Sequence, residues 1–278
     1  FPNESRSMAT GIVTAAASIG YFLSPLFTKY SLGTAGWENT LKYFMYFILF
    51  GLIASVFLLP NKNNSKESNL STNQAFVPAL KEAFSHKGYI LLVAGFFVCG
   101  FQLAFITVHM PSYLADKGFD SSIAAASLAI IGLSNIFGSL VSGHLSGIYS
   151  KKWILAVIYG ARSIVIVLFL LIPISTFTIY AFSFATGLLW LATVPPTSGL
   201  VAQMFGLRFM GTLYGIVFLN HQIGSFTGVW LGGYLFDTTG SYNQVWWWAA
   251  IIAAITALIH VFIDERPIKR LRVAERTS

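Results

Sequence analysis

Long apolar runs, separated by short polar segments, make up most of the chain. A helix that crosses a bilayer needs about 20 mostly apolar residues, and its backbone groups must be satisfied within the helix. The runs are continuous, unlike the alternating strands of a membrane barrel. Eight segments qualify: Met8–Thr28, Tyr43–Leu59, Tyr89–Met110, Ile123–Leu145, Trp153–Pro173, Phe177–Leu200, Leu213–Phe236 and Trp246–Ile263. The sequence therefore predicts an all-α membrane protein with eight transmembrane helices.

The basic residues between the runs are distributed unevenly. With eight spans both chain ends lie on one side, and 13 Lys and Arg fall on that side against three on the other. Positive charge accumulates on the cytoplasmic side of membrane proteins, so we expect a multi-pass protein of the plasma (inner) membrane with both ends cytoplasmic. A composition of 55% hydrophobic and 10% charged residues excludes a soluble domain. The net charge of +7 reflects this sidedness, and no nucleic-acid partner is expected.

The longest polar stretch divides the chain after the second span. Residues 61–87 form a predicted cytoplasmic linker, whose second part, from Phe76 to His86, places apolar side chains on one helical face. Such a segment is typical of a helix lying at the membrane interface. Residues 265–278 form a basic cytoplasmic tail.

An internal repeat relates the first span to the seventh. A shift of 204 residues aligns them without a gap and gives eleven identities, including Tyr30 with Tyr234, Thr34 with Thr238 and Gly36 with Gly240. The repeating unit is then six helices in the same orientation, as in transporters built from two parallel halves. Residues 1–60 would be the last two helices of the N-terminal half, and residues 88–264 the C-terminal half. We expect about 120 preceding residues, so that these are helices 5–12 of twelve.

Several runs carry a family resemblance. They are residues 95–102 (GFFVCGFQ), 187–199 (GLLWLATVPPTSG), 220–226 (NHQIGSF) and 232–237 (GGYLFD). On these runs the chain resembles the major facilitator superfamily, and within it the branch of monocarboxylate transporters and oxalate–formate exchangers. The resemblance implies a monomeric secondary active transporter that works by alternating access, without an enzymatic activity or a cofactor.

One loop departs from the superfamily pattern. The cytoplasmic signature Gly-x-Leu-Ala-Asp-Arg-x-Gly-Arg-Arg would fall on residues 143–152, where Gly143, Leu145 and the basic pair Lys151-Lys152 match. Gly147 replaces the acid and Ile148 the first arginine. Charge pairing in this loop is therefore in doubt.

The spans contain one strong charge, Arg162, because all ten acids lie outside them. An unpaired charge at that depth costs about 2.5–3.5 kcal/mol. Its partner is an acid elsewhere in the protein, backbone carbonyls freed from a helix, or an anionic solute; a packing clamp between helices is the structural alternative. The spans contain no carboxylate to carry a proton, so proton coupling would need His109, His221 or an acid in preceding helices.

Two groups of polar residues lie within the later spans. Asn220, His221 and Gln222 fan out around one helix, so at least one is expected to face a cavity, unless they bond neighbouring helices. Thr186, Trp190, Thr193 and Thr197 share a face of the sixth span, above Pro195-Pro196, which removes backbone donors and should bend the helix. That face would either line a water-filled solute cavity or pack against neighbouring helices at a kink.

The remaining candidates are less distinctive. Gln102 and His109 share a face of the third span, although His109 could be interfacial, and Asn135 in the fourth span is more typical of helix packing. Glycines spaced by four in the seventh span, among them Gly224, Gly228 and Gly232, predict close helix contact across the interface between the halves.

The sequence thus predicts a secondary active transporter of a small organic solute, with a monocarboxylate or similar organic anion as the substrate. Its other partners would be a proton or a counter-substrate and the lipid bilayer. The alternative is a non-transporting membrane sensor or an inactive truncated remnant of a transporter. An enzyme is disfavoured because the spans hold no nucleophile–base set, paired carboxylates or metal cluster.

Overall fold

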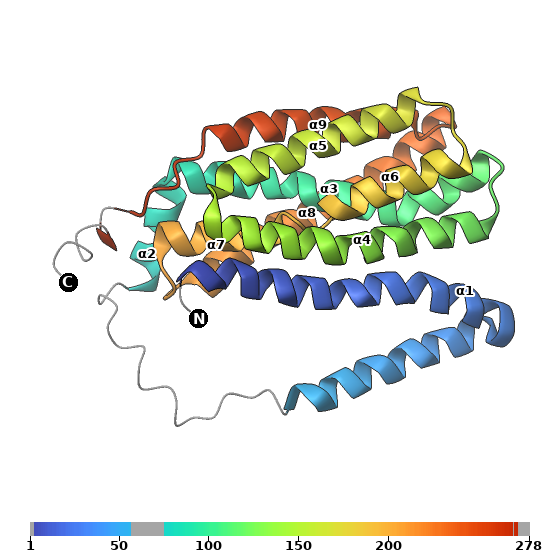
Figure 1. Ribbon diagram of the computed structural model, residues 1–278, viewed down its shortest axis with the longest axis horizontal. Coiled ribbons are helices and arrows are strands. Elements are labelled where there is room, and N and C mark those ends of the chain that lie inside the picture. The colour runs from blue at the N-terminus through green and yellow to red at the C-terminus, as the bar shows by residue number, and fades with distance from the viewer. Residues whose placement is uncertain (1–2, 57–74, 269, 272–278) are drawn as a thin grey trace.

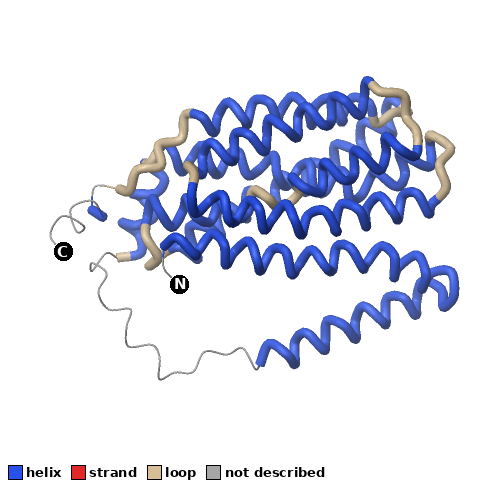
Figure 2. The backbone as a smooth tube through the Cα atoms, viewed as in Figure 1, coloured by secondary structure: helices blue, strands red, loops and turns tan. Residues whose placement is uncertain are grey.

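The computed structural model describes residues 3–56, 75–268 and 270–271. Long helices, and no strand, make up these ranges, so the predicted all-α class is confirmed. The helices are α1 (Asn3–Val56), α2 (Phe76–Ser85), α3 (Lys87–Asp116), α4 (Ser121–Ile148), α5 (Lys151–Leu171), α6 (Thr176–Leu189), α7 (Val194–Phe205), α8 (Met210–Thr239) and α9 (Asn243–Val261). Figures 1 and 2 show them as a bundle in which the start of α1 and the end of α9 share one end. Most of the predicted linker and tail lies outside the described residues.

All eight predicted spans fall on these helices. The first two occupy the two arms of α1, the sixth covers α6 and α7, and the others correspond to α3, α4, α5, α8 and α9. By length and composition, six helices of the described residues could cross a membrane. This number treats the two arms of α1 as one helix and joins α6 and α7 as Thr176–Phe205. The 30-residue α8 is not among them, because Asn220, His221 and Gln222 lower its mean hydropathy.

The predicted loop after Thr28 is wrong, because helix continues to Gly36. Gly36 alone breaks the helical backbone inside α1, with φ 77° and ψ 172°, a conformation that glycine adopts without steric cost. Thr34 Oγ1 donates to the Tyr30 carbonyl (2.9 Å) in the turn that precedes it. The second arm then returns along the first (Figure 1).

A similar hydrogen bond precedes the glycine that ends α8. Thr238 Oγ1 donates to the Tyr234 carbonyl (2.8 Å), and Gly240 follows with φ 66° and ψ 16°. These residues are the repeat partners of Thr34, Tyr30 and Gly36, so the two copies share the Thr–Tyr bond and a glycine with positive φ, although the ψ angles of the two glycines differ.

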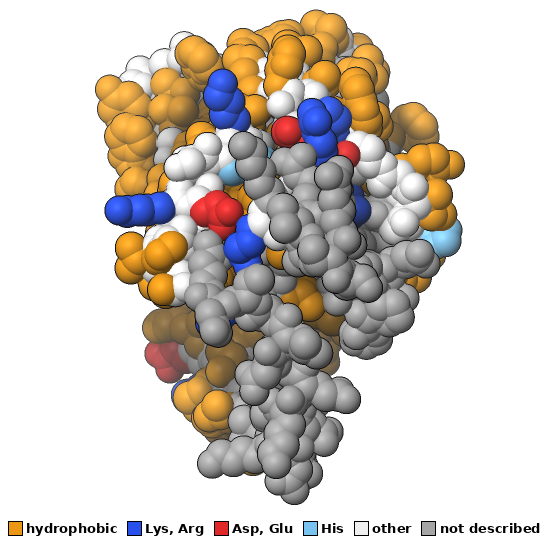
Figure 3. All heavy atoms as spheres, turned by 90° about the vertical axis from the view of Figure 1, so that its left-hand side faces the viewer, with side chains coloured by type: hydrophobic (Ala, Val, Ile, Leu, Met, Phe, Trp, Pro, Cys, Tyr) orange, Lys and Arg blue, Asp and Glu red, His pale blue; other side chains and the backbone are white. Residues whose placement is uncertain are grey.

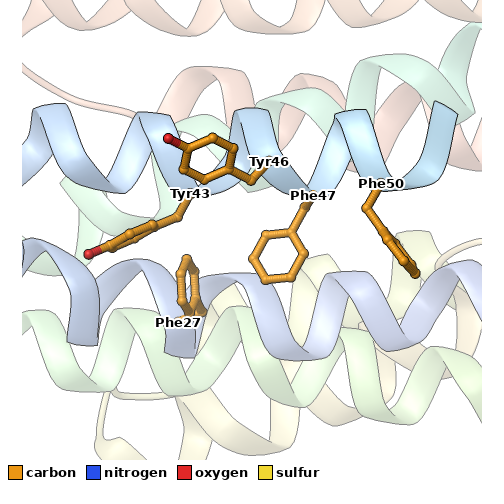
Figure 4. Close-up of a pocket in the computed structure, with 5 residues that line it drawn as sticks. All are labelled: Phe27, Tyr43, Tyr46, Phe47 and Phe50. Atoms are coloured by element: carbon orange, nitrogen blue, oxygen red, sulfur yellow. The ribbon is translucent and has the colours of Figure 1, made fainter. Parts of the chain in front are cut away.

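Aromatic side chains fill the space between the arms of α1. The Phe27 ring centroid lies 5.6 Å from that of Phe44 and 5.7 Å from that of Phe47. Figure 4 shows Phe47 and Phe50 directed from the second arm toward the first, beside an apolar cavity of about 430 Å³. Away from this contact the second arm is exposed, with Ile48 at 71% and Leu52 at 64%, which is the surface that a hydrocarbon environment favours.

Small residues let the helix backbones touch. A side chain at Gly224 or Gly228 of α8 would collide with the Phe97 or Phe101 carbonyl of α3. The predicted glycine contact therefore exists, but its partner is α3 and not a helix of the first predicted half. On the other side of the bundle, Gly11 of α1 packs in the same way against Ser139 and Gly143 of α4.

The sixth span is discontinuous. Helix α6 ends at Leu189 and α7 begins at Val194, with Pro195 and Pro196 in its first turn. Proline suits the first turn of a helix because no intrahelical donor is required there. The predicted bend is present, but the break precedes the prolines, at residues 190–193, and exposes backbone groups that buried protein must satisfy.

Arg162 of α5 satisfies the carbonyls of this break. Its Nε (3.1 Å) and Nη2 (2.6 Å) donate to the Leu189 carbonyl, and Nη2 also donates to the Trp190 carbonyl. Nη1 donates to Gln102 Oε1 of α3 at 3.4 Å. Of the partners for Arg162 left open by the sequence, the described residues supply the freed backbone carbonyls. The side-chain amide of Gln102 is a further partner that was not predicted.

Helix α4 holds the other side of the break. The Leu191 N–H donates to Asn135 Oδ1 at 2.9 Å, and Ser142 Oγ donates to the Ala192 carbonyl. Asn135 Nδ2 also donates to Ser18 Oγ of α1 at 2.7 Å. The break is thus tied to α1, α4 and α5 together.

Glu265, just beyond α9, meets the loop that lacks the signature acid. Its carboxylate accepts from Ser150 Oγ (2.6 Å) and the Lys152 N–H (2.8 Å) at the start of α5. Its carbonyl accepts from Gln203 Nε2 of α7 (3.0 Å). A carboxylate at a helix N-terminus is favoured by the helix dipole, so an acid from a distant segment stabilises this loop.

We predict that Gly228→Leu lowers the free energy of unfolding by about 1–3 kcal/mol, because the added side chain overlaps the α3 backbone. Gly215→Leu is the matched control, since no atom lies within 4 Å of a Cβ there and leucine favours helix. Denaturant unfolding in detergent, followed by circular dichroism, measures both. Equal losses would contradict the α3–α8 contact.

We predict that Arg162→Met lowers the free energy of unfolding by about 2–4 kcal/mol, because buried carbonyls lose their donors. Arg266→Met is the control: Arg266 pairs with Asp264 at 3.1 Å on an exposed surface, where ion pairs contribute about 0–1 kcal/mol. The same unfolding experiment compares them. If both variants unfold like the wild type, the clamp on the break contributes nothing.

Candidate functional site

A cavity of about 730 Å³ lies between the first arm of α1, α3 and α4. It occupies the half of the bundle that contains the Gly36 turn and the α3–α4 connection. Its lining is Tyr21, Ser24, Pro25, Thr28, Lys29, Leu32, Gly33, Thr107, Pro111, Ala115, Phe119, Ser121, Ala124, Ala125, Leu128, Ile131 and Trp190. The size and the mostly apolar wall with a few polar groups are typical of a small-molecule site.

Lys29 supplies the charge in this lining. The sequence placed Lys29 in an external loop; the continuation of α1 to Gly36 puts it on a cavity wall. Close by, Asp120 caps α4 by accepting from the Ser122 N–H at 2.7 Å. Hydrogen bonds from the Ser122 side chain and backbone, and then the charge of Lys29, lower the pKa of Asp120.

Trp190 separates this cavity from a second, much smaller one. The indole is 2% exposed and lines both. The smaller void, about 10 Å³, is bounded by α3, α5 and α6 through Gln102, Leu103, Ile106, Arg162, Ile166, Thr186 and Trp190. Its volume is about that of one water molecule.

The polar groups around the void differ in how they are satisfied. Gln102 Nε2 donates to the Ala249 carbonyl of α9 at 2.9 Å, and its Oε1 accepts from Arg162. Thr186 Oγ1 and Trp190 Nε1 are buried and have no hydrogen-bond partner among the described residues. Three of the predicted site residues, Gln102, Arg162 and Trp190, are therefore brought together here.

The other members of the predicted threonine face lie away from both cavities. Thr193 is fully buried, with its Oγ1 3.3 Å from Cys99 Sγ of α3. Thr197 is fully buried too, and its Oγ1 has no partner within the described part of the chain. Asn135 lies at the break, where it bonds the Leu191 N–H and Ser18.

His109 and Asn220 connect α3 with α8. His109 Nε2 lies 2.9 Å from the Val229 carbonyl, and Asn220 Nδ2 donates to the Val93 carbonyl at 2.7 Å. Such interhelical bonds contribute about 0.6 kcal/mol on average. Neither side chain lines the 730 Å³ cavity.

His221 is buried on the same helix interface and Gln222 is exposed. The His221 ring lies between Phe96 and Phe218, with centroid distances of 5.2 and 5.5 Å. Its Nδ1 is 3.1 Å from Gln222 Oε1. The structure places neither residue on the lining of the cavity.

Most residues of the cavity wall were not among those predicted from the sequence. Ser24 and Thr28 lie four residues apart on one helical face, directly before Lys29, and Thr107 precedes Pro111 by four residues on α3. These hydroxyls at helical spacing were a usable signal. The identity of the helix that they face was not readable, because it depends on how α1 packs against α4.

Comparison with known proteins agrees with this architecture. The family model described as Major Facilitator Superfamily matches residues 1–228. The uncharacterized MFS-type transporter YcxA of Bacillus subtilis is 25% identical over 283 residues, covering 95% of this chain and 66% of that protein. Monocarboxylate transporter 1 of Mus musculus is 31% identical over 191 residues, covering 65% of this chain and 37% of that protein.

Solved structures share the fold. The fucose:proton symporter FucP of E. coli superposes with a TM-score of 0.69 at 15% identity, covering 95% of this chain and 70% of that chain. A FucP structure in the outward conformation gives a TM-score of 0.66 at 16% identity, with the same coverage. The chain spans 66% and 37% of the length of the two relatives named above. From the family match and the shared fold, the chain belongs to the Major Facilitator Superfamily.

Proposed function

We propose that this protein is a secondary active transporter of a small organic anion, a monocarboxylate in particular, that works by alternating access. The observation that carries the proposal is the 730 Å³ cavity, which is lined by Lys29 and Trp190. On the other side of Trp190, Arg162 lines the small void. Among the described residues, Lys29 is the one charged member of the cavity lining. A cation without a carboxylate in the lining favours an anionic solute.

Alternating access is supported by the unequal packing of the two ends. At the end where α1 begins, Ser198 Oγ of α7 donates to Thr10 Oγ1 of α1 at 3.4 Å. A Cβ at Gly143 of α4 would lie 3.0 Å from the Ser7 carbonyl. The cavity lies between α1, α3 and α4 at the opposite end, so α1 and α4 are in tight contact at one end and separated at the other.

The direction of this opening follows from the charges. Figure 3 looks onto the tightly packed end and shows Lys and Arg side chains gathered among a few acids. If this end is cytoplasmic, as positive charge favours, the cavity opens outward.

The discontinuous sixth span supports a moving element beside the solute. Substrate sites in transporters are often built at broken helices near the bilayer midplane, and Trp190 lies at such a break. The Thr–Tyr bond before a positive-φ glycine in both α1 and α8 supports the two-half organisation, with residues 1–60 and 88–264 in different halves of a twelve-helix protein.

The monocarboxylate is favoured over a neutral sugar by charge and by relatives. Monocarboxylate transporter 1 shares 31% identity with the chain, whereas FucP shares 15% and thus the fold alone. Trp190, Gln102 and Arg162 are the proposed solute-side residues. A non-transporting sensor or an inactive remnant would bind solute without moving it, or would not bind it at all.

We predict that proteoliposomes of the purified protein accumulate labelled pyruvate and not labelled fucose, when a pH gradient or a trans-pyruvate gradient is imposed. Lys29→Gln should raise the KM for pyruvate about fivefold or more, since it removes a cation from the cavity. Lys42→Gln, on the exposed second arm, is the control. Fucose uptake without pyruvate uptake would overturn the anion assignment.

We predict that His221→Gln abolishes pH-driven pyruvate accumulation and leaves pyruvate exchange intact. His221 is the proposed proton carrier because imidazole titrates near neutral pH and the described spans offer no carboxylate in the cavity lining. His144→Gln, on an exposed position of α4, is the control. Unchanged accumulation in the His221 variant would remove His221 from the coupling mechanism.

A further inference from the structure

The small void behind Trp190 collects hydrogen-bond donors that the helix packing leaves unused. Thr186 is 7% and Trp190 2% exposed, and their Oγ1 and Nε1 atoms have no partner in the described part of the chain. Both side chains line the void. Buried polar atoms are normally satisfied, so two orphans on one void call for an occupant.

The chemistry of the lining identifies the class of that occupant. Trp190 Nε1 and the Arg162 guanidinium only donate hydrogen bonds. Gln102 has its Oε1 and Nε2 engaged with Arg162 and Ala249. The rest of the lining is Leu103, Ile106 and Ile166. Within the described residues, the Thr186 hydroxyl is the one unpartnered group of this lining that can also accept. Donors and a positive charge therefore outnumber acceptors, which suits an anion.

The charge of Arg162 points the same way. Arg162 is 5% exposed, and its hydrogen-bond partners within the described residues are neutral carbonyls and an amide. One Nη1 hydrogen is left without a partner in that set. A buried guanidinium is stabilised most by an anionic partner, and the void lies against it.

Size and access decide how an anion reaches this position. The void of about 10 Å³ holds one oxygen-sized group, and Trp190 is the wall that it shares with the 730 Å³ cavity. Trp190 lies at the break between α6 and α7; hydrogen bonds to Gly187 and Arg162 hold its backbone, and these bonds leave the side chain free to turn. A turn of the indole would join the void to the cavity.

We propose that the void behind Trp190 is a carboxylate subsite. One carboxylate oxygen of a ligand in the 730 Å³ cavity enters it and accepts hydrogen bonds from Thr186 Oγ1, Trp190 Nε1 and the Arg162 guanidinium. The proposal rests on the proposed transport of an organic anion, because it places the anionic group of that solute. It adds Thr186, and the indole N–H of Trp190, as residues that select carboxylates over neutral solutes.

The test is equilibrium binding of labelled acetate to the purified protein in lipid nanodiscs. Thr186→Val removes the hydroxyl at constant shape, and Trp190→Phe keeps a ring without the N–H. Each should weaken acetate binding about tenfold, as expected for one lost hydrogen bond to a charged group. Thr186→Ser restores the hydroxyl and should bind within about twofold of the wild type. Thr227→Val and Trp230→Phe on α8 are matched controls.

Competition on the wild-type protein gives a readout that needs no variant. Formate should displace acetate, whereas acetamide, which has the same shape without the charge, should not. Displacement by acetamide as strong as by formate would overturn the subsite, as would displacement by chloride alone at the same concentration, which indicates a site for a monatomic ion. Variants that bind acetate like the wild type would also overturn it.

The two proposals fail in different ways. If the wild type binds and transports monocarboxylates, and Thr186→Val and Trp190→Phe leave acetate affinity unchanged, the subsite is wrong and the transport proposal stands. If the wild type neither binds acetate nor takes up pyruvate, the organic-anion function is wrong and the subsite falls with it.

Discussion

The contact between the Arg162 guanidinium and the carbonyls of Leu189 and Trp190 is the constraint on which the rest of the site depends. A break in a buried helix frees backbone groups, and freed groups inside a membrane are costly unless protein satisfies them. Arg162 does so from α5, and Asn135 does so from α4. Because the break is held, Trp190 is held with it, between the large cavity and the small void.

The helix contacts differ in what they permit. Where glycines meet a backbone, as at Gly228 and the Phe101 carbonyl, the helices are in direct contact and a side chain has no room. The first arm of α1 shows both kinds of contact: Gly11 meets the backbone of α4 at one end, whereas near the Gly36 turn the same arm lines the cavity with α3 and α4. One helix therefore packs tightly at one end of the bundle and borders open space at the other.

The sequence could predict the helices because long apolar runs in lipid have few other solutions. It also predicted a bend near Pro195 and an unusual partner for Arg162. It could not choose that partner, because carbonyls are free only once the break at residues 190–193 is known, and no residue type marks it. Lys29 was misplaced for a related reason: hydropathy falls after Thr28, whereas the helix continues to Gly36. Local hydrogen bonds, not apolarity, extend that helix.

The hydrogen bonds that hold the break at residues 190–193 are made to main-chain atoms of the broken helix. These bonds therefore depend on residue type in the surrounding helices and not in the broken helix itself. At Leu189 and Ala192 the atoms that are held are carbonyl oxygens, which every amino acid provides, so these bonds place no limit on the side chain there. Leu191 contributes its N–H, so proline alone is barred by that bond. The residues under constraint are the remote donors and acceptors on α4 and α5. A family alignment centred on the broken helix would therefore understate its importance, and covariation would appear among the helices that surround it.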